Sequence, residues 1–83
     1  PFHPKLKESW KLLSRAYQKR REFELAIQSE IAIYLEFPTQ REGFEAFLEA
    51  GRAHLKQGNW EMSQRIFQEI VNQSYFPEIA RAA

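Results

Sequence analysis

The amino-acid sequence predicts an all-α fold made of two antiparallel helix–turn–helix hairpins, followed by the start of a fifth helix. Apolar residues recur every three or four positions, which is the spacing of one face of an α-helix. The tripeptide Gln57-Gly58-Asn59 has the composition of a tight turn between two helices. The two halves of the chain also echo each other at an offset of 37 residues, as from Trp10 to Phe47. No stretch shows the alternation of a strand.

The first helix is expected to begin near Pro4, where a missing amide hydrogen costs nothing. Its apolar stripe then follows at steps of four, three and four residues: Leu6, Trp10, Leu13 and Tyr17. The cations of Lys19-Arg20-Arg21 suit the helix C-terminus, where the macrodipole favours positive charge.

A second helix is expected from about Glu22 to Glu36, and it is apolar on most of its circumference. One face contains Phe23, Ala26, Ile27, Ile33, Tyr34 and Phe37, and another contains Leu25, Ala32 and Leu35. A helix with so much apolar surface is usually covered on two sides. We therefore expect a neighbour in addition to its hairpin partner.

The third helix is expected to start at Gln40, because Thr39 and Glu42 match a capping box. Its inner stripe is Phe44, Phe47, Leu48, Gly51, His54 and Leu55. A glycine inside a helix costs up to about 1 kcal/mol relative to alanine. We expect Gly51 to offset this cost by letting another helix approach closely.

A fourth helix is expected from Trp60 to about Asn72, and Trp60 should pin it onto the third helix. The residues expected to be buried are Trp60, Ser63, Gln64, Phe67, Ile70 and Val71. Pro77 can open a fifth helix.

Composition limits the chemistry that the chain can carry. It has no cysteine, which excludes disulfides and thiolate metal sites. No segment is apolar enough to span a bilayer, and residues 1–10 lack the apolar core of a signal peptide. We therefore expect a cytoplasmic, intracellular protein. The 83 residues are expected to form one helical-repeat domain that is part of a longer protein.

Charge is distributed unevenly, although the net charge is only +1. Residues 1–21 contain seven Lys or Arg against one acidic residue, whereas residues 22–83 contain five against ten. A bipolar surface of this kind orients charged partners more than it strengthens their binding. A solvated helix face explains the same pattern without any partner.

The echo between the two halves resembles the tetratricopeptide repeat family, whose unit is a helix–turn–helix of about 34 residues. The first unit carries Trp10, Leu13, Ser14, Tyr17, Phe23, Ala26 and Pro38 at the family's spacing, and the second carries Gly51, Gly58-Asn59-Trp60, Phe67 and Ile70. The resemblance implies a tetratricopeptide-repeat-like α-solenoid with units at about 7–38 and 44–76, and with 77–83 starting a capping or next-repeat helix. The departures from the family pattern are Ser14 for glycine, Glu30 for an aromatic, His54 for tyrosine and Ser63 for alanine.

Members of this family have no active site of their own and bind peptides or helices in a groove lined by the first helix of each unit. The resemblance therefore implies a protein-interaction scaffold or adaptor without a cofactor, and not an enzyme. Carried over by position, the groove would contain Lys11, Arg15, Gln18 and Lys19 of the first unit and Leu48, Arg52, Leu55 and Lys56 of the second, beside Glu8 and Glu45.

Two of these cations, Lys11 and Arg15, are four residues apart and so share one helix face. Their placement looks like the pair that some chaperone-binding members use to hold a peptide carboxylate. Arg15 and Arg52 stand where that clamp has asparagines. We therefore expect instead a looser preference for acidic segments, through Lys11, Arg15, Arg52 and Lys56. Surface charge screened by salt is the alternative.

Glu30 stands in the middle of an apolar helix face, and burying a carboxylate without a partner is costly. The family geometry points this position toward the next unit. We therefore expect Glu30 to contact Arg52 or His54.

Other functions are considered beside protein binding. The basic first helix could bind RNA. The apolar residues Leu25, Ile31 and Leu35, together with the unfinished terminal helix, could meet a second copy of the chain to form a homodimer. His3 and His54 are far apart in sequence and lack an acidic pair at metal-ligand spacing, so we expect no metal site. No phosphate loop or nucleophile motif occurs.

Overall fold

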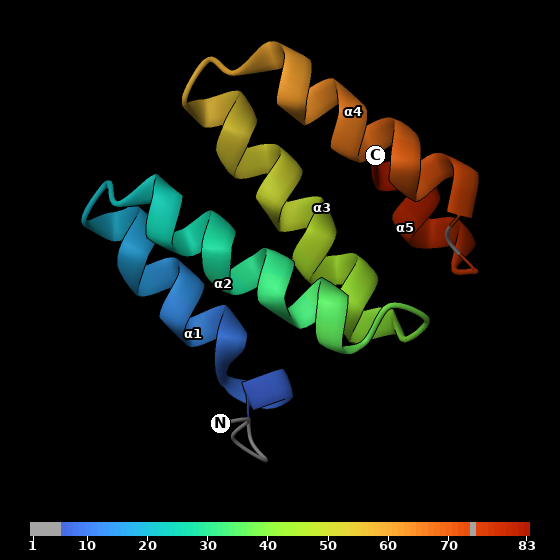
Figure 1. Ribbon diagram of the computed structural model, residues 1–83, viewed down its shortest axis with the longest axis horizontal. Coiled ribbons are helices and arrows are strands. Elements are labelled where there is room, and N and C mark those ends of the chain that lie inside the picture. Colours follow the sequence, from blue (N-terminus) through green and yellow to red (C-terminus); the bar gives the residue numbers. More distant parts are fainter. Residues whose placement is uncertain (1–5, 74) are drawn as a thin grey trace.

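The computed structural model describes residues 6–73 and 75–83, and this part of the chain forms five helices without a strand (Figure 1). The helices are α1 (Leu6–Lys19), α2 (Phe23–Glu36), α3 (Arg41–Lys56), α4 (Trp60–Gln73) and α5 (Pro77–Ala82). The all-α prediction is confirmed. The expected helix start at Pro4 and the histidine His3 lie outside the described residues.

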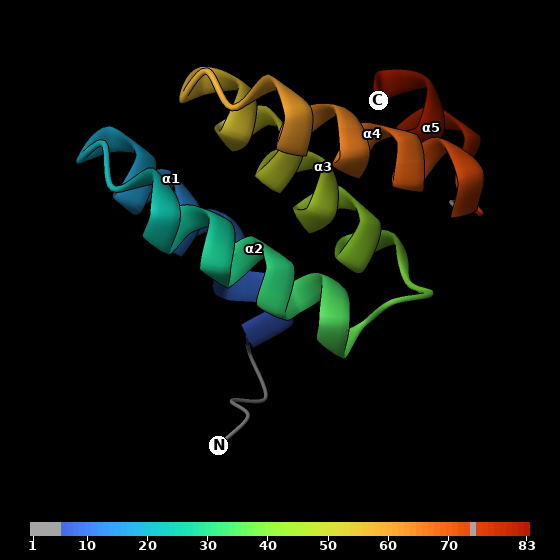
Figure 2. The ribbon, with the colours of Figure 1, turned by 45° about the horizontal axis from the view of Figure 1, so that its top comes forward.

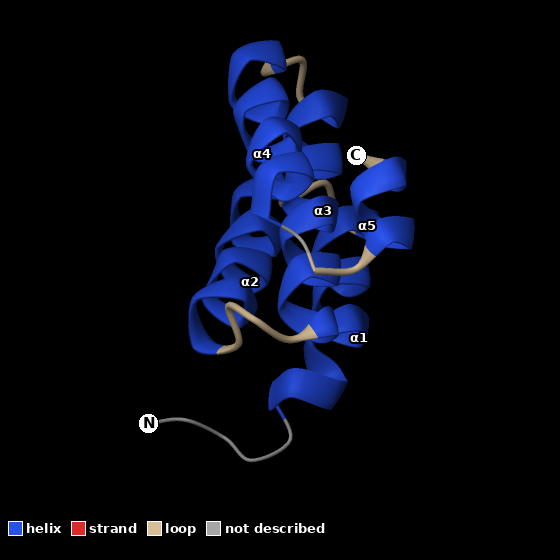
Figure 3. Ribbon diagram, turned by 90° about the vertical axis from the view of Figure 1, so that its right-hand side faces the viewer, coloured by secondary structure: helices blue, strands red, loops and turns tan. Residues whose placement is uncertain are grey.

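The helices form two layers. Figure 3 shows α2 and α4 on one side of the molecule and α1, α3 and α5 on the other. The hairpins α1–α2 and α3–α4 lie side by side (Figure 2), so that α2 packs against both α1 and α3. α2 therefore has the second neighbour that the sequence predicts, whereas its face of Leu25, Ala32 and Leu35 is exposed to solvent.

A tight turn joins α3 to α4. Gly58 has a φ of +80°, and its N–H donates to the carbonyl of Leu55 at 2.9 Å. The N–H of Asn59 donates to the carbonyl of His54 at 2.9 Å. This pair of bonds is the Schellman motif, which satisfies the last carbonyls of a helix and favours glycine at the left-handed position.

The same motif joins α1 to α2, but here its left-handed residue is Arg21, with a φ of +61°. The N–H of Arg21 donates to the carbonyl of Gln18 at 3.0 Å, and that of Glu22 donates to the carbonyl of Tyr17 at 2.8 Å. The two hairpins therefore share one turn geometry with different residues at its most constrained position.

The offset of 37 residues read from the sequence also relates the helix bounds. α2 spans Phe23–Glu36, and α4 spans Trp60–Gln73. α1 ends at Lys19 and α3 at Lys56. Each of these bounds in the second hairpin lies 37 residues after its counterpart in the first.

The core has two apolar clusters. The larger one contains Ile27, Phe44, Leu48, Ala50, Ala53, Ile66, Ile70 and Ile79. The smaller one joins α1, α2 and α3 through Trp10, Ile33 and Ala46. Of the residues expected to meet a second copy of the chain, Leu25 and Leu35 are exposed, whereas Ile31 packs against the larger cluster.

The expected burial of Trp60 is wrong, because its side chain is 68% exposed. α4 presents Ser63, Ile66 and Ile70 to the core, and Gln64 and Val71 also face solvent. Trp60 is the first residue of α4, and the helix that follows α4 in the chain is α5. That helix has six residues and lies near the C-terminal end of α4, far from the turn that Trp60 follows (Figure 1).

The start of α3 differs from the expected capping box. The helix begins at Arg41, and its N-cap is Gln40, whose side chain makes no capping hydrogen bond. The expectation for Gly51 holds: a Cβ at this position would lie 2.6 Å from the ring of Phe67 on α4. The close approach of α3 and α4 therefore depends on a glycine here.

Candidate partner-binding groove

A groove of about 500 Å³ lies between α1, α3 and α5. It is lined by Trp10, Lys11, Ser14, Arg15 and Gln18 of α1, by Arg41, Glu45, Leu48, Glu49 and Arg52 of α3, and by Glu78, Ile79 and Ala82 of α5. All three elements belong to the same layer of helices (Figure 3). The groove is therefore open on the side of the molecule opposite α2 and α4.

The structure brings most of the expected groove residues together. Lys11, Arg15, Gln18, Leu48 and Arg52 line the groove. Lys56 lies at its edge, where its Nζ donates a hydrogen bond of 2.9 Å to Gln18 Oε1. Lys19 and Leu55 are exposed and do not line the groove. The side chain of Glu8 is not among those described.

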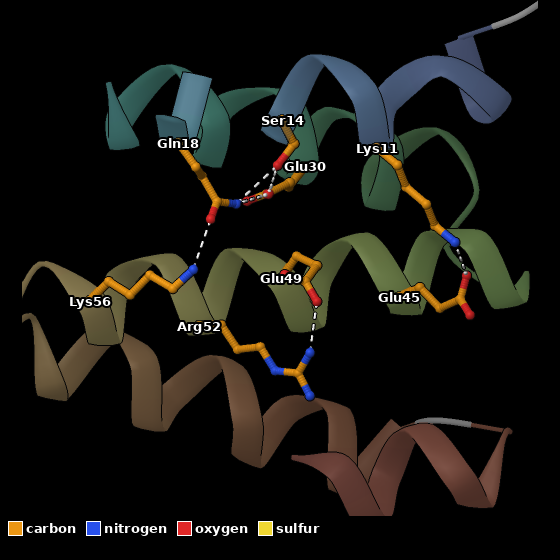
Figure 4. A network of polar contacts seen from close by, with 8 residues as sticks. All are labelled: Lys11, Ser14, Gln18, Glu30, Glu45, Glu49, Arg52 and Lys56. Carbon is orange, nitrogen blue, oxygen red and sulfur yellow. Dashed lines mark hydrogen bonds and ion pairs between the residues drawn. The ribbon is translucent and has the colours of Figure 1, made fainter. Parts of the chain in front are cut away.

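The groove carries four cations and three carboxylates, and most of these charges pair with each other. Lys11 Nζ lies 3.7 Å from Glu45 Oε1, across the space between α1 and α3 (Figure 4). Arg52 Nη1 lies 2.8 Å from Glu49 Oε2 on the same helix. These pairs leave few of the lining charges available to a ligand.

The third pair ties α5 to α3. The guanidinium of Arg41 donates to the carboxylate of Glu78 and also lies over the ring of Phe76, 4.7 Å from its centroid. A backbone hydrogen bond holds the pKa of the Glu78 carboxyl below its ordinary value, and the hydrogen bond from Arg41 contributes in the same direction. Ile79 is buried in the larger core cluster. α5 is thus a fixed wall of the groove.

Arg15 differs from the other three cations. It is exposed, lines the groove and has no ion-pair partner among the side chains that the structure describes, those of residues 10–73 and 75–83. It follows Lys11 by one helical turn on the same face of α1. A negative group that enters the groove would therefore meet Arg15 as the lining cation that no carboxylate already neutralises.

A buried polar cluster joins α1 to α2 beside the groove (Figure 4). Glu30 is fully buried, and its Oε2 accepts hydrogen bonds from Ser14 Oγ and, at 3.3 Å, from Gln18 Nε2. The contact expected with Arg52 or His54 is wrong. Glu30 turns toward α1, within its own hairpin, because Ser14 supplies a hydroxyl donor there.

This cluster is not fully satisfied. Glu30 Oε1 is buried without a hydrogen-bond partner. The pKa of the Glu30 carboxyl is raised from its ordinary value of 4.5 to about 7. Burial is the main cause, the hydrogen bond from Ser14 opposes it, and the nearby Glu49 adds a smaller increase. Near neutral pH the groove thus lies over a carboxyl that exchanges its proton with small changes of pH.

Part of the groove lining is apolar. Leu48 is 7% exposed and Ile79 is 4% exposed, and the exposed Ala82 also lines the groove. The groove therefore combines a narrow apolar floor with charged walls. An occupant needs an apolar stripe flanked by polar groups.

The sequence did not indicate the contribution of α5 to the groove. Glu78, Ile79 and Ala82 belong to a segment recognised only as the start of a helix. A signal for the polar cluster was present: Ser14 and Glu30 are two of the departures from the repeat pattern, and they contact each other. Two departures that compensate each other indicate a contact better than either does alone.

Comparisons with protein-family models, curated proteins and solved structures find no match for this chain. Within the described residues, no three His, Cys, Asp or Glu side chains gather as a metal ion would need. None of the described helices combines the length and the apolar character of a membrane span.

Proposed function

We propose that the protein is an interaction module that binds a segment of a partner protein in the groove between α1, α3 and α5. The observation that carries the proposal is the apolar floor of Leu48 and Ile79 between charged walls. A groove of this kind fits a peptide or a helix with one apolar face. The tetratricopeptide-repeat-like pattern of the sequence supports the same function, because stacked hairpins expose an extended binding surface.

The partner segment carries an acidic residue that reaches Arg15. Three of the four lining cations are neutralised by carboxylates of the groove itself, and Arg15 is not. The paired charges confer orientation more than affinity, because exposed ion pairs contribute at most about 1 kcal/mol. Arg15 therefore selects the partner's charge, and Leu48 and Ile79 supply the apolar contact.

RNA is the weaker candidate for this groove. Glu45, Glu49 and Glu78 line it, and carboxylates repel the phosphates on which non-specific RNA affinity depends. The basic α1 would present only one cationic row beside three acidic side chains. No observation in the groove favours a nucleic acid over a peptide.

Selection from a random peptide library tests the proposed function. We expect the wild-type protein to enrich peptides that place Asp or Glu beside an apolar stripe. Arg15→Glu should weaken binding of the selected peptides at least about tenfold, which corresponds to about 1.4 kcal/mol, and should select basic residues in place of acidic ones.

Arg65→Glu is the matched control, because Arg65 is an exposed arginine of α4, outside the groove. It should leave the affinity and the selected sequences unchanged. Identical peptides from the wild type and Arg15→Glu would contradict the role of Arg15. A failure of the wild type to enrich any peptide would contradict the proposed function itself.

A further inference from the structure

A second, smaller cleft of about 430 Å³ lies where the α2–α3 and α4–α5 connections come together. It is lined by Tyr34, Pro38, Thr39, Phe44, Asn72, Gln73 and Tyr75. None of these residues lines the groove of α1, α3 and α5. Both connections lie at the same end of the hairpins (at the right of Figure 1), so the cleft opens at helix ends and not on a helix face.

Aromatic rings form the base and sides of this cleft. Phe44 is 1% exposed and forms the base. Tyr34 is fixed by two neighbours: it stacks on Phe47 with ring centroids 4.0 Å apart, and its centroid lies 5.7 Å from that of Phe44. Tyr75 meets Phe44 at an edge-on angle of 79° and is 70% exposed. The packed ring of Tyr34 and the exposed ring of Tyr75 thus flank the buried ring of Phe44.

The polar side chains of the cleft are uncharged and can donate hydrogen bonds. Thr39, Asn72 and Gln73 are exposed, and none of the described residues that line the cleft is Lys, Arg, Asp or Glu. Gln68 Nε2 donates to Asn72 Oδ1 at 3.1 Å, which leaves the amide donor of Asn72 for another acceptor. Burial raises the pKa of Tyr34 above its ordinary value, with a smaller contribution from Glu69, so the tyrosine hydroxyl keeps its proton as well.

We propose that this cleft binds a proline-rich segment of a partner protein in the polyproline II conformation. Such a segment presents apolar proline rings and backbone carbonyls but few N–H groups, which matches a site of aromatic rings and hydrogen-bond donors. Its conformation is largely formed before binding, so little conformational entropy is lost. An uncharged lining also gives no reason for a strongly acidic or basic occupant.

A small quaternary ammonium group is the competing ligand, because aromatic rings attract cations. The base of the cleft does not suit it: the ring of Phe44 is buried, and none of the lining residues carries a carboxylate. A quaternary ammonium has no hydrogen-bond acceptor either, so it would leave the donors of the cleft unused. The two ligands can be separated in one experiment.

The experiment is an NMR titration of the isotope-labelled protein with an acetylated and amidated peptide of about nine prolines, long enough for three turns of polyproline II. We expect saturable shifts at Thr39, Asn72, Gln73 and Tyr75. Tyr75→Ala should weaken the peptide at least about tenfold, which is about 1.4 kcal/mol. Gln73→Ala removes an exposed donor without touching a ring and should give a smaller loss.

Leu12→Ala is the matched control, because Leu12 and Tyr75 are both 70% exposed and Leu12 lies on α1, outside the cleft. It should not change the affinity, and neither should Arg15→Glu, which disables the groove alone. An absence of saturable shifts at millimolar peptide would overturn the proposal. So would unchanged affinity in both Tyr75→Ala and Gln73→Ala, shifts confined to the groove, or cleft shifts produced by tetramethylammonium chloride and not by the peptide.

Discussion

The two hairpins have the same backbone arrangement, but the side chains between their helices are polar in the first and apolar in the second. At the offset of 37 residues, Ser14 corresponds to Gly51 and Glu30 corresponds to Phe67. In the first hairpin the serine hydroxyl donates to the buried carboxylate. In the second hairpin the phenylalanine ring packs against the glycine, where even a Cβ would come within 2.6 Å. A polar pair and an apolar pair thus occupy the same place.

This difference shows that two hairpins with the same turns and helix bounds can have different interior side chains. The apolar pair keeps its stability at any pH, whereas the polar pair leaves Glu30 Oε1 without a partner and makes it titratable near pH 7. Each pair also depends on both of its members. The Glu30 carboxylate needs the hydrogen bond from the Ser14 hydroxyl, and the Phe67 ring needs a glycine at position 51 because a Cβ there would clash with it. Exchanges between the hairpins therefore test whether the two interiors are equivalent.

The largest effect is expected from Phe67→Glu, which places the residue of the first hairpin into the second without its serine. Loss of the ring should lower the free energy of unfolding by about 3 kcal/mol, and the carboxylate would face Gly51, which offers no side-chain donor. Urea unfolding followed by circular dichroism measures the loss.

The double variant Gly51→Ser/Phe67→Glu recreates the polar pair and should recover part of this loss. The relevant quantity is the coupling energy of the double-mutant cycle. Effects that simply add would show that the two interior positions are not equivalent.

The second effect is the dependence of stability on pH through Glu30. The folded chain holds this proton with a pKa of about 7, against 4.5 ordinarily, so the folded state binds it more tightly than the unfolded chain does. The contribution of Glu30 to the free energy of unfolding should therefore be greatest below pH 4.5 and fall by roughly 3 kcal/mol as pH rises to 7. Unfolding curves recorded across this range measure the slope.

Glu30→Gln should remove this slope, since the amide does not titrate. Glu61→Gln serves as the control, because the side chain of Glu61 is 82% exposed on α4, and it should leave the slope intact. A slope that persists in Glu30→Gln would assign the titration to another group.

The sequence predicted most of the backbone and less of the side-chain placement. Helix bounds and turns depend on local signals such as Gly58 and the apolar period, which lie within a few residues of their effect. The exposure of Trp60 and the partner of Glu30 both depend on which neighbouring helix lies beside each residue. These are properties of the packed fold, which periodicity does not encode.

The candidate groove shows the same division. The residues of α1 and α3 could be expected from position within the repeat, because helices that correspond in sequence lie in one layer (Figure 3). The wall formed by Glu78 and Ile79, and the ion pairs that neutralise Lys11 and Arg52, required the folded chain. The singular position of Arg15 follows from those pairs and was not visible in the charge pattern alone.

A third and smaller effect concerns the close approach of α3 and α4. Gly51→Ala places a methyl group against the Phe67 ring and Ile66, so the ring must shift, at a cost of about 1 to 2 kcal/mol. Adding Phe67→Leu to Gly51→Ala should relieve the contact, and the double variant should lose less than the sum of the two single changes. Thermal unfolding of the four proteins gives the comparison, and strict additivity would contradict the steric explanation.

The smallest effect lies in the turns, where Arg21 and Gly58 adopt the same left-handed conformation. Gly58→Ala should lower the free energy of unfolding by about 1 kcal/mol, since nothing crowds the new methyl group and only the backbone is strained. Arg21→Gly should raise it by about 0.5 kcal/mol, because relief of the strain exceeds the added flexibility of the unfolded chain. Arg20→Gly is the control for loss of charge, since Arg20 is exposed and precedes the left-handed position. An equal rise in the free energy of unfolding for Arg20→Gly and Arg21→Gly would assign the effect to charge. A rise for Arg21→Gly together with a fall for Gly58→Ala would show that the first hairpin has a strained backbone at a position where the second hairpin does not.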